Sequence, residues 1–256
     1  LLPHLSGVVD DIAIVRSGVT NRIDHGEALL MMHTGRPIPG FPTIGSWITS
    51  GLGTETQNLP AYVSMSNINA YRERLATGSA FLPSLYQCTP MNYSGGGAPF
   101  AFLSPPSSGN DESNRQRDYL QLTQALNRRH LESRRELEEL DTRIQNFELA
   151  ARMQVEAMKS IDVSQESEVT KRLYGIDGDD KETNDFGMRC LLARRLVESG
   201  VRYVHLMHHD WDHHSNLDNE LGYNATVVDQ QITELIKDLK DRGMIDETIV
   251  VLGTDF

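Results

Sequence analysis

The stretch VRYVHLMHHDWDHH, residues 201–214, decides the fold of this chain. Its first seven residues are mostly β-branched or otherwise apolar, which is typical of a buried strand. The next seven contain four histidines and two aspartates, and packing alone is a poor explanation for so many polar groups in one short loop. We therefore predict a strand over residues 201–207 that ends in a loop with chemical function.

Helical patterns lie on both sides of this strand in the chain. Phe186–Ser199 is amphipathic and is followed by a glycine, the residue that most often ends a helix. Asn224–Arg242 also has apolar residues at helical spacing, and the apolar run Ile249–Leu252 follows it. Strand, helix and strand in this order predict a right-handed parallel crossover, with residues 201–207 and 249–252 adjacent or nearly adjacent in one sheet.

The first part of the chain has a similar alternation. Ile12–Val15 is a short β-branched run that predicts a buried strand, and Glu27–His33 predicts a helix ended by glycine and proline. A second helix is predicted over Ile44–Leu52, and a second strand over Ala61–Met65. This order favours an α/β fold with a largely parallel sheet.

Residues 66–182 interrupt the alternation. Glycine- and proline-rich stretches predict loops, and a long polar helix is predicted to begin near Ser113. Residues at helical spacing would form its single apolar face: Leu137, Leu140, Ile144, Phe147 and Ala151. A coiled-coil partner is the alternative, although no heptad repeat persists for long enough to favour it. We expect one α/β domain over residues 1–256, with residues 66–182 as an insertion that contains this amphipathic helix.

Charge restricts the partners of the chain. It has 24 basic and 36 acidic residues, which gives a formal net charge of −12. Such a charge repels phosphate backbones and anionic lipids, so we expect no nucleic-acid partner. No window approaches the run of about 18 apolar residues typical of a membrane helix, so no membrane span is expected. Two cysteines are too few for a disulfide framework or a cysteine-rich zinc site.

Imidazoles and carboxylates are predicted to meet where strand 201–207 ends. Open α/β sheets bind ligands at the carboxyl ends of their strands, and Asp255 follows the predicted strand 249–252 on the same edge. Asp212 and His214 are two residues apart on an irregular loop, so both side chains can turn to one ion. These donors suit a divalent metal, with zinc or manganese favoured and calcium as a further candidate. The alternative is a solvated loop whose aspartates cap the next helix.

Several short motifs are spread over essentially the whole chain, namely Leu2–Leu5, Val9–Ser17, His25 with Thr34–Arg36, Gly45–Trp47, Gln57–Ala61 and Trp211–His214. Together they resemble the bacterial "domain of unknown function fifteen-oh-one" family, part of the alkaline phosphatase/sulfatase-like superfamily. The resemblance implies a largely parallel sheet sandwiched by helices, with a two-metal hydrolytic site at one edge, in a periplasmic or secreted protein.

The resemblance also implies roles for particular residues. Asp212 and His214 match the Trp-Asp-x-His pair of the family, and Asp255 matches an acidic residue after a later strand, so all three are expected metal ligands. His25 matches a histidine after an early strand and is expected to line the substrate pocket. Two residues depart from the family pattern, since Asp210 stands where glycine is usual and Asp255 where glutamate is common.

The arginines offer an anion site. Arg16 and Arg36 could each bind a sulfate or phosphate with two hydrogen bonds, and a surface or ion-paired position explains them equally well. The chain opens on Leu1 and closes soon after an apolar strand pattern, which is typical of an internal portion of a longer protein. We therefore expect the catalytic nucleophile upstream and little esterase activity from this portion alone.

Three function classes remain open. The leading one is a metal-dependent hydrolase of sulfate or phosphate esters, or an inactive descendant, acting on a small anionic ester or sulfated carbohydrate. The second is a non-catalytic secreted scaffold or binding protein with the same fold. The third is a helical interaction protein built on the long insertion helix. Substrate and oligomeric state do not follow from the sequence.

Overall fold

A computed structural model describes residues 1–66, 76–93, 110–132, 140–141, 144–149 and 160–254. Its sheet has three parallel strands in the order β2-β1-β3. β1 is Tyr62–Ser66, β2 is Thr89–Pro90 and β3 is Tyr203–Met207. In the register of the central pair, Val63 lies opposite Val204. The predicted strands 61–65 and 201–207 and their parallel direction are therefore confirmed.

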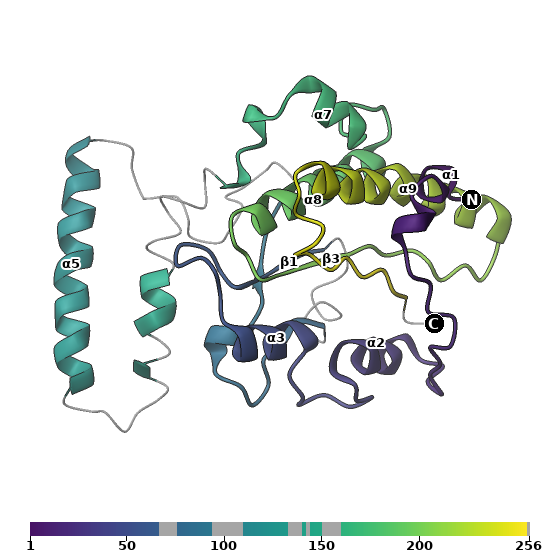
Figure 1. Ribbon diagram of the computed structural model, residues 1–256. Helices are drawn as coiled ribbons and strands as arrows, with labels where there is room; N and C mark the ends of the chain where they lie inside the picture. The colour runs from purple at the N-terminus through teal and green to yellow at the C-terminus, as the bar shows by residue number, and fades with distance from the viewer. Residues whose placement is uncertain (67–75, 94–109, 133–139, 142–143, 150–159, 255–256) are drawn as a thin grey trace.

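Helices cover both faces of this sheet (Figure 1). On one face lie α8 (Lys181–Glu198) and α9 (Leu217–Asp241), and the short α1 (Pro3–Ser6) packs on α9. On the other lie α2 (His25–Thr34) and α3 (Ile44–Leu52). The chain is thus a layered α/β structure, as predicted, although the sheet between the layers is small.

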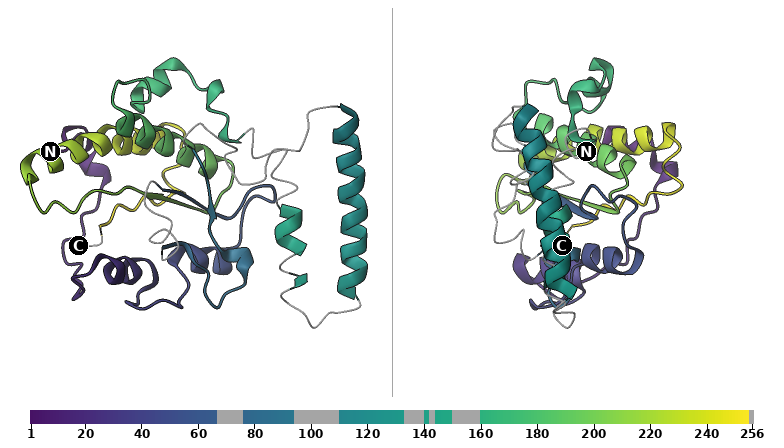
Figure 2. Two further views of the ribbon diagram at one scale, coloured as in Figure 1. Left: turned by 180° about the vertical axis from the view of Figure 1, so that it is seen from behind. Right: turned by 90° about the vertical axis from the view of Figure 1, so that its left-hand side faces the viewer.

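The remaining described elements are short, apart from one long helix. They are the 3₁₀ turns η1 (Val9–Asp11), η2 (Ser84–Tyr86) and η3 (Val163–Gln165), and helix α7 (Glu168–Leu173). The long helix α5 (Asn110–Glu132) lies to one side of the layered body (Figure 1, and Figure 2, left). It already contains Ser113, so the predicted start there is three residues too late. Leu137 and Ala151 of the predicted apolar face lie outside the described residues, and Phe147 is exposed.

Local sequence chemistry sets the helix ends that frame the site. The Asp24 carboxylate accepts hydrogen bonds from the backbone N–H groups of Gly26 and Glu27, which places His25 in the first turn of α2. The Asp180 carboxylate caps α8 in the same way through Thr183 N–H, at 2.8 Å. Gly200 has φ +88° just beyond α8, so a glycine turns the chain into β3.

The core lies between the sheet and the α8–α9 layer. Val63 and Met65 of β1 are fully buried against α8, where Leu192 and Leu196 contact them, and Val201 joins them just before β3. A second cluster holds α8 and α9 together. On the opposite face, a Cβ on Gly45 of α3 would lie 2.6 Å from Tyr62, so the helix can pack this closely only with glycine there. β1 and β3 are therefore held in place by helix packing on both faces of the sheet.

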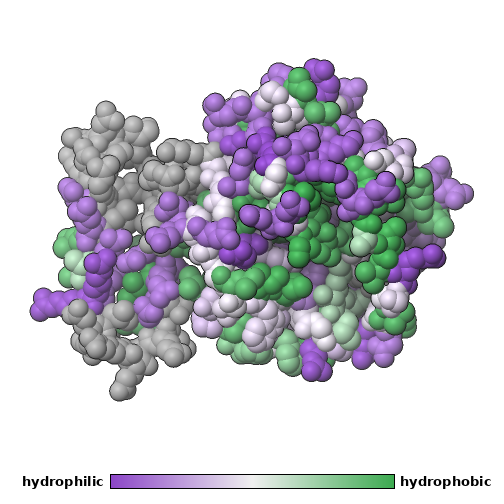
Figure 3. Space-filling view, viewed as in Figure 1, coloured by the Kyte–Doolittle hydropathy of each residue, from purple (hydrophilic) through white to green (hydrophobic). Residues whose placement is uncertain are grey.

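Two predicted strands are wrong. Residues 12–15 and 249–252 are extended without ladder partners, and their side chains are among the most exposed apolar groups, such as Val15 at 81% and Ile249 at 89%. Figure 3 shows several groups of apolar side chains on the surface seen in the view of Figure 1. β-branched runs have strand propensity, but a strand forms only where a neighbour accepts its hydrogen bonds. The predicted pairing of residues 201–207 with 249–252 is consequently not formed.

The described helices include none whose length and hydrophobicity together would let it span a lipid bilayer.

Candidate functional site

The loop after β3 has two backbone positions that only some residues tolerate. Asp210 has φ +69° and Asn216 has φ +53°, both in the left-handed region. Asparagine, aspartate and glycine enter this region most readily, which explains why the loop is irregular and why α9 begins only at Leu217. At both positions the side chain is one that tolerates this backbone conformation.

Asp212 brings two histidines together from distant parts of the chain. Its Oδ2 lies 2.9 Å from Nε2 of His25 in the first turn of α2, and its Oδ1 lies 2.9 Å from Nε2 of His214. These contacts hold the pKa of the Asp212 carboxyl below its usual range, with the His25 hydrogen bond as the largest cause. His214 of the loop and His25 of α2 thus both contact the Asp212 carboxylate, and the binding of Asp212 and His214 to one ion stays a prediction.

This trio has the donor types of a zinc or manganese site, since it offers two imidazole nitrogens and one carboxylate. Its present arrangement is one of mutual hydrogen bonding. Within the described ranges, no group of three or more histidine, cysteine, aspartate or glutamate side chains is placed so that it could hold a metal ion. A metal bound by the trio would have to replace the two hydrogen-bonded contacts by nitrogen and oxygen ligation. Asp255, the third ligand predicted from the sequence, lies outside the described residues.

The other loop histidines have different environments. His208 packs its ring against Phe186 and Trp211, and burial lowers its pKa to about 4. Nδ1 of His209 lies 2.5 Å from the Asp210 carboxylate. Of the loop imidazoles, His214 contacts Asp212 and His209 contacts Asp210, whereas His25 reaches Asp212 from α2.

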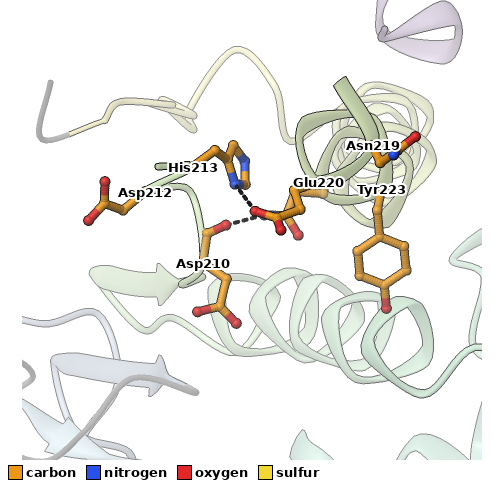
Figure 4. Close-up of a pocket in the computed structure, with 7 residues that line it drawn as sticks. Asp210, Asp212, His213, Asn219, Glu220 and Tyr223 are labelled. Carbon is orange, nitrogen blue, oxygen red and sulfur yellow. Dashed lines mark hydrogen bonds and ion pairs between the residues drawn. The ribbon is translucent and has the colours of Figure 1, made fainter. Parts of the chain in front are cut away.

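His213 faces α9 and not Asp212. Its Nδ1 lies 3.3 Å from Oε2 of Glu220, in the first turn of that helix, and only 5% of its side chain is exposed. Figure 4 shows the imidazole directed at Glu220, with Asp212 leaving the loop in another direction. The amide of Asn224 donates to the Asp210 carbonyl, so α9 also holds the loop backbone.

A cavity of about 700 Å³ lies between this loop and α9. Asp210, Asp212 and His213 line it from the loop, and α9 contributes Asn219, Glu220, Tyr223 and Asn224. The sequence analysis did not identify the α9 residues. An available signal was the position of Glu220 in the first turn of the helix that follows a histidine-rich loop.

Neither predicted anion-binding arginine lies at this loop. Arg16 is exposed on the extended segment that follows η1, and Arg36 stacks over the ring of Phe41 at 5.7 Å from the ring centroid. In the part of the chain that the structure describes, no contact joins either guanidinium to Asp212 or to its two histidines. Their role in substrate binding stays a prediction.

Comparison with known proteins identifies a family and nothing beyond it. The family model described as "Protein of unknown function (DUF1501)" matches residues 1–256. No curated protein and no solved structure matches the chain. The family description names no activity, so a functional argument has to start from the site.

Proposed function

The chain belongs to the DUF1501 family, and from that premise we propose that it is a divalent-metal-dependent hydrolase of small sulfate or phosphate esters. The proposal includes descent from the alkaline phosphatase/sulfatase-like superfamily and a periplasmic or secreted location. Its substrate would be a small anionic ester, including a sulfated carbohydrate. Zinc or manganese is the favoured ion, with calcium as a further candidate.

The observation that carries the proposal is the meeting of Asp212 with His25 and His214. The carboxylate oxygens of Asp212 lie 2.9 Å from Nε2 of His25 in α2 and 2.9 Å from Nε2 of His214 in the same loop. The site lies at the carboxyl end of β3, where open α/β sheets bind their ligands. Nothing in the core requires these three groups to meet, because His214 is 87% exposed and Asp212 is 43% exposed.

The three side chains would supply different kinds of ligand to the ion. Asp212 would supply negative charge and a ligand oxygen, and the two imidazoles would supply neutral nitrogens. Metal ions bind the neutral form of imidazole through a ring nitrogen that carries no hydrogen, so metal binding at this site would weaken as the pH falls. A bound divalent ion neutralises the charge that develops on the attacking and leaving oxygens of an anionic ester.

Activity of the full-length protein tests this function. We expect metal-dependent hydrolysis of 4-nitrophenyl phosphate or 4-nitrophenyl sulfate that a chelator abolishes. Asp212→Asn should reduce it by at least about 100-fold, because the metal loses its only charged ligand among the three groups. Asp218→Asn, which changes an exposed carboxylate in the first turn of α9, is the matched control and should retain activity. Turnover that survives both the chelator and Asp212→Asn would contradict the proposal.

A second candidate is a non-catalytic binding protein with the same fold. The observation in its favour is that His25, Asp212 and His214 already satisfy one another, so the contact can serve to tie α2 to the loop. In that case the full-length protein would show no turnover. Asp212→Asn would then lower the stability of the protein equally with and without metal.

A further inference from the structure

We propose that two copies of this chain pair through helix α5, with the two helices antiparallel. The contact surface is the α5 stripe, which we define as Tyr119, Leu122 and Leu126. α5 lies to one side of the layered body (Figure 1, and Figure 2, left). The inference goes beyond the proposed function, because it assigns an interaction surface and does not involve the loop at Asp212.

The α5 stripe is an apolar helix face that the rest of the chain leaves exposed. Residues three and four apart lie on the same face of a helix, so the three side chains are neighbours. Their exposed fractions are 70% for Tyr119, 59% for Leu122 and 58% for Leu126. The half-buried side chains of α5 follow another side of the helix, and they are Thr123, Gln124 and Asn127. Large apolar side chains that adjoin one another at a surface mark a contact site.

The charge of α5 permits pairing between copies of an otherwise repulsive chain. The whole chain has a formal net charge of −12, so two copies repel each other. α5 differs from the rest, since it contains four acidic and four basic residues and is neutral overall. A contact through α5 therefore brings together the two neutral helices and leaves the acidic bodies to the sides.

The charges beside the α5 stripe select a second antiparallel copy as the occupant. Asp118 stands before the stripe and Arg129 after it, both are exposed, and their spacing of eleven residues is close to three full helical turns. Within the described part of the chain, neither side chain has an ion-pair partner.

An antiparallel copy satisfies both charges at once. When Leu122 of one helix lies against Leu126 of the other, Asp118 of each helix faces Arg129 of the other. Parallel helices would instead place like charges together, and charges that flank an apolar stripe set the orientation of paired helices. The pair uses the same surface on both copies, so it closes as a two-fold dimer and does not extend into a filament.

The size of the stripe sets the expected strength. Three apolar side chains from each copy make a small interface, which is typical of weak and reversible complexes. We expect a monomer–dimer equilibrium with a Kd on the order of 10–100 µM.

Sedimentation equilibrium of the full-length protein over a range of concentrations tests the inference. Leu122→Gln should raise the Kd at least about tenfold, because it removes the central apolar contact. Glutamine has a helix propensity close to that of leucine, so far-ultraviolet circular dichroism should be unchanged. The matched control is Leu52→Gln in α3, where the leucine is 68% exposed, and it should keep the Kd of the parent protein.

A charge-reversal cycle tests the orientation without touching the apolar contact. Asp118→Arg and Arg129→Glu should each raise the Kd at least about threefold, because each turns both exposed ion pairs of the dimer into like-charge pairs. The double variant restores opposite charges and should return the Kd to near the parent value. A protein that stays monomeric about tenfold above the expected Kd would overturn the proposal. A dimer that Leu122→Gln leaves unchanged, or a double variant as weak as the single ones, would overturn it equally.

Discussion

Replacing Asp210 by glycine and by alanine gives a direct measure of backbone strain in the site loop. The φ of +69° costs a non-glycine residue about 1–2 kcal/mol. Glycine relieves this strain but loses about 0.5–1 kcal/mol through its greater freedom in the unfolded chain. Alanine keeps the strain and, like glycine, loses the exposed contact with His209. Both variants remove the same carboxylate, so the difference between them reports the backbone alone.

We therefore expect Asp210→Gly to be more stable than Asp210→Ala by about 1 kcal/mol, or about 2–4 °C in Tm. The assay is equilibrium unfolding in urea with equal m-values, checked by thermal melting at neutral pH. Asp210→Asn is the control, since asparagine enters the left-handed region without losing the side-chain length. An alanine variant as stable as the glycine variant would refute the strain argument.

Three further predictions concern stability and the loop. Burial of His33 against His205 lowers the pKa of His33 to about 4, so between pH 6.5 and 4 the unfolded chain binds a proton that the native chain excludes. The free energy of unfolding should therefore fall by up to about 1.4 kcal/mol per pH unit as the pH drops through this range, and in urea unfolding the His33→Gln variant should show a smaller fall per pH unit. Gly45→Ala should destabilise the protein by about 1–3 kcal/mol in the same assay, because the added Cβ would lie 2.6 Å from Tyr62; an unchanged midpoint would show that α3 packs more loosely than its geometry indicates. In melting curves with and without metal, His214→Ala should lose the metal-dependent rise in Tm, whereas His213→Ala should keep more of it, because His213 contacts Glu220 and not Asp212. Equal losses in the two variants would place His213 among the metal ligands.

Much of the layered fold follows from local patterns. β3, α8 and α9 combine strong apolar periodicity with clear end signals, and all three lie close to where the sequence predicts them. The helix starts are the least accurate part. α9 begins at Leu217 and not at Asn224, because Gly222 and several polar residues interrupt the apolar pattern of its first two turns.

The two wrongly predicted strands share a physical cause, because the pairing of a strand depends on neighbours that are distant in the sequence. Residues 12–15 and 249–252 have the composition of strands, but β-propensity does not specify a partner, and neither segment has one in the described structure. In the candidate site, too, one contact was predictable from the local sequence and another was not. The approach of Asp212 and His214 is predictable from their two-residue spacing on a loop. The approach of His25 depends on where α2 packs, so its place beside Asp212 could not be derived from spacing.

The metal content of the full-length protein tests the central claim most directly. After incubation with Zn²⁺ or Mn²⁺ and exhaustive dialysis, mass spectrometry of the metal should find the divalent ion retained by the parent protein and by Asp218→Asn. Asp212→Ala should retain little of it, because the carboxylate that joins His25 and His214 is gone. Equal metal content in Asp212→Ala and the parent would contradict the metal site, and the binding-protein alternative would take its place.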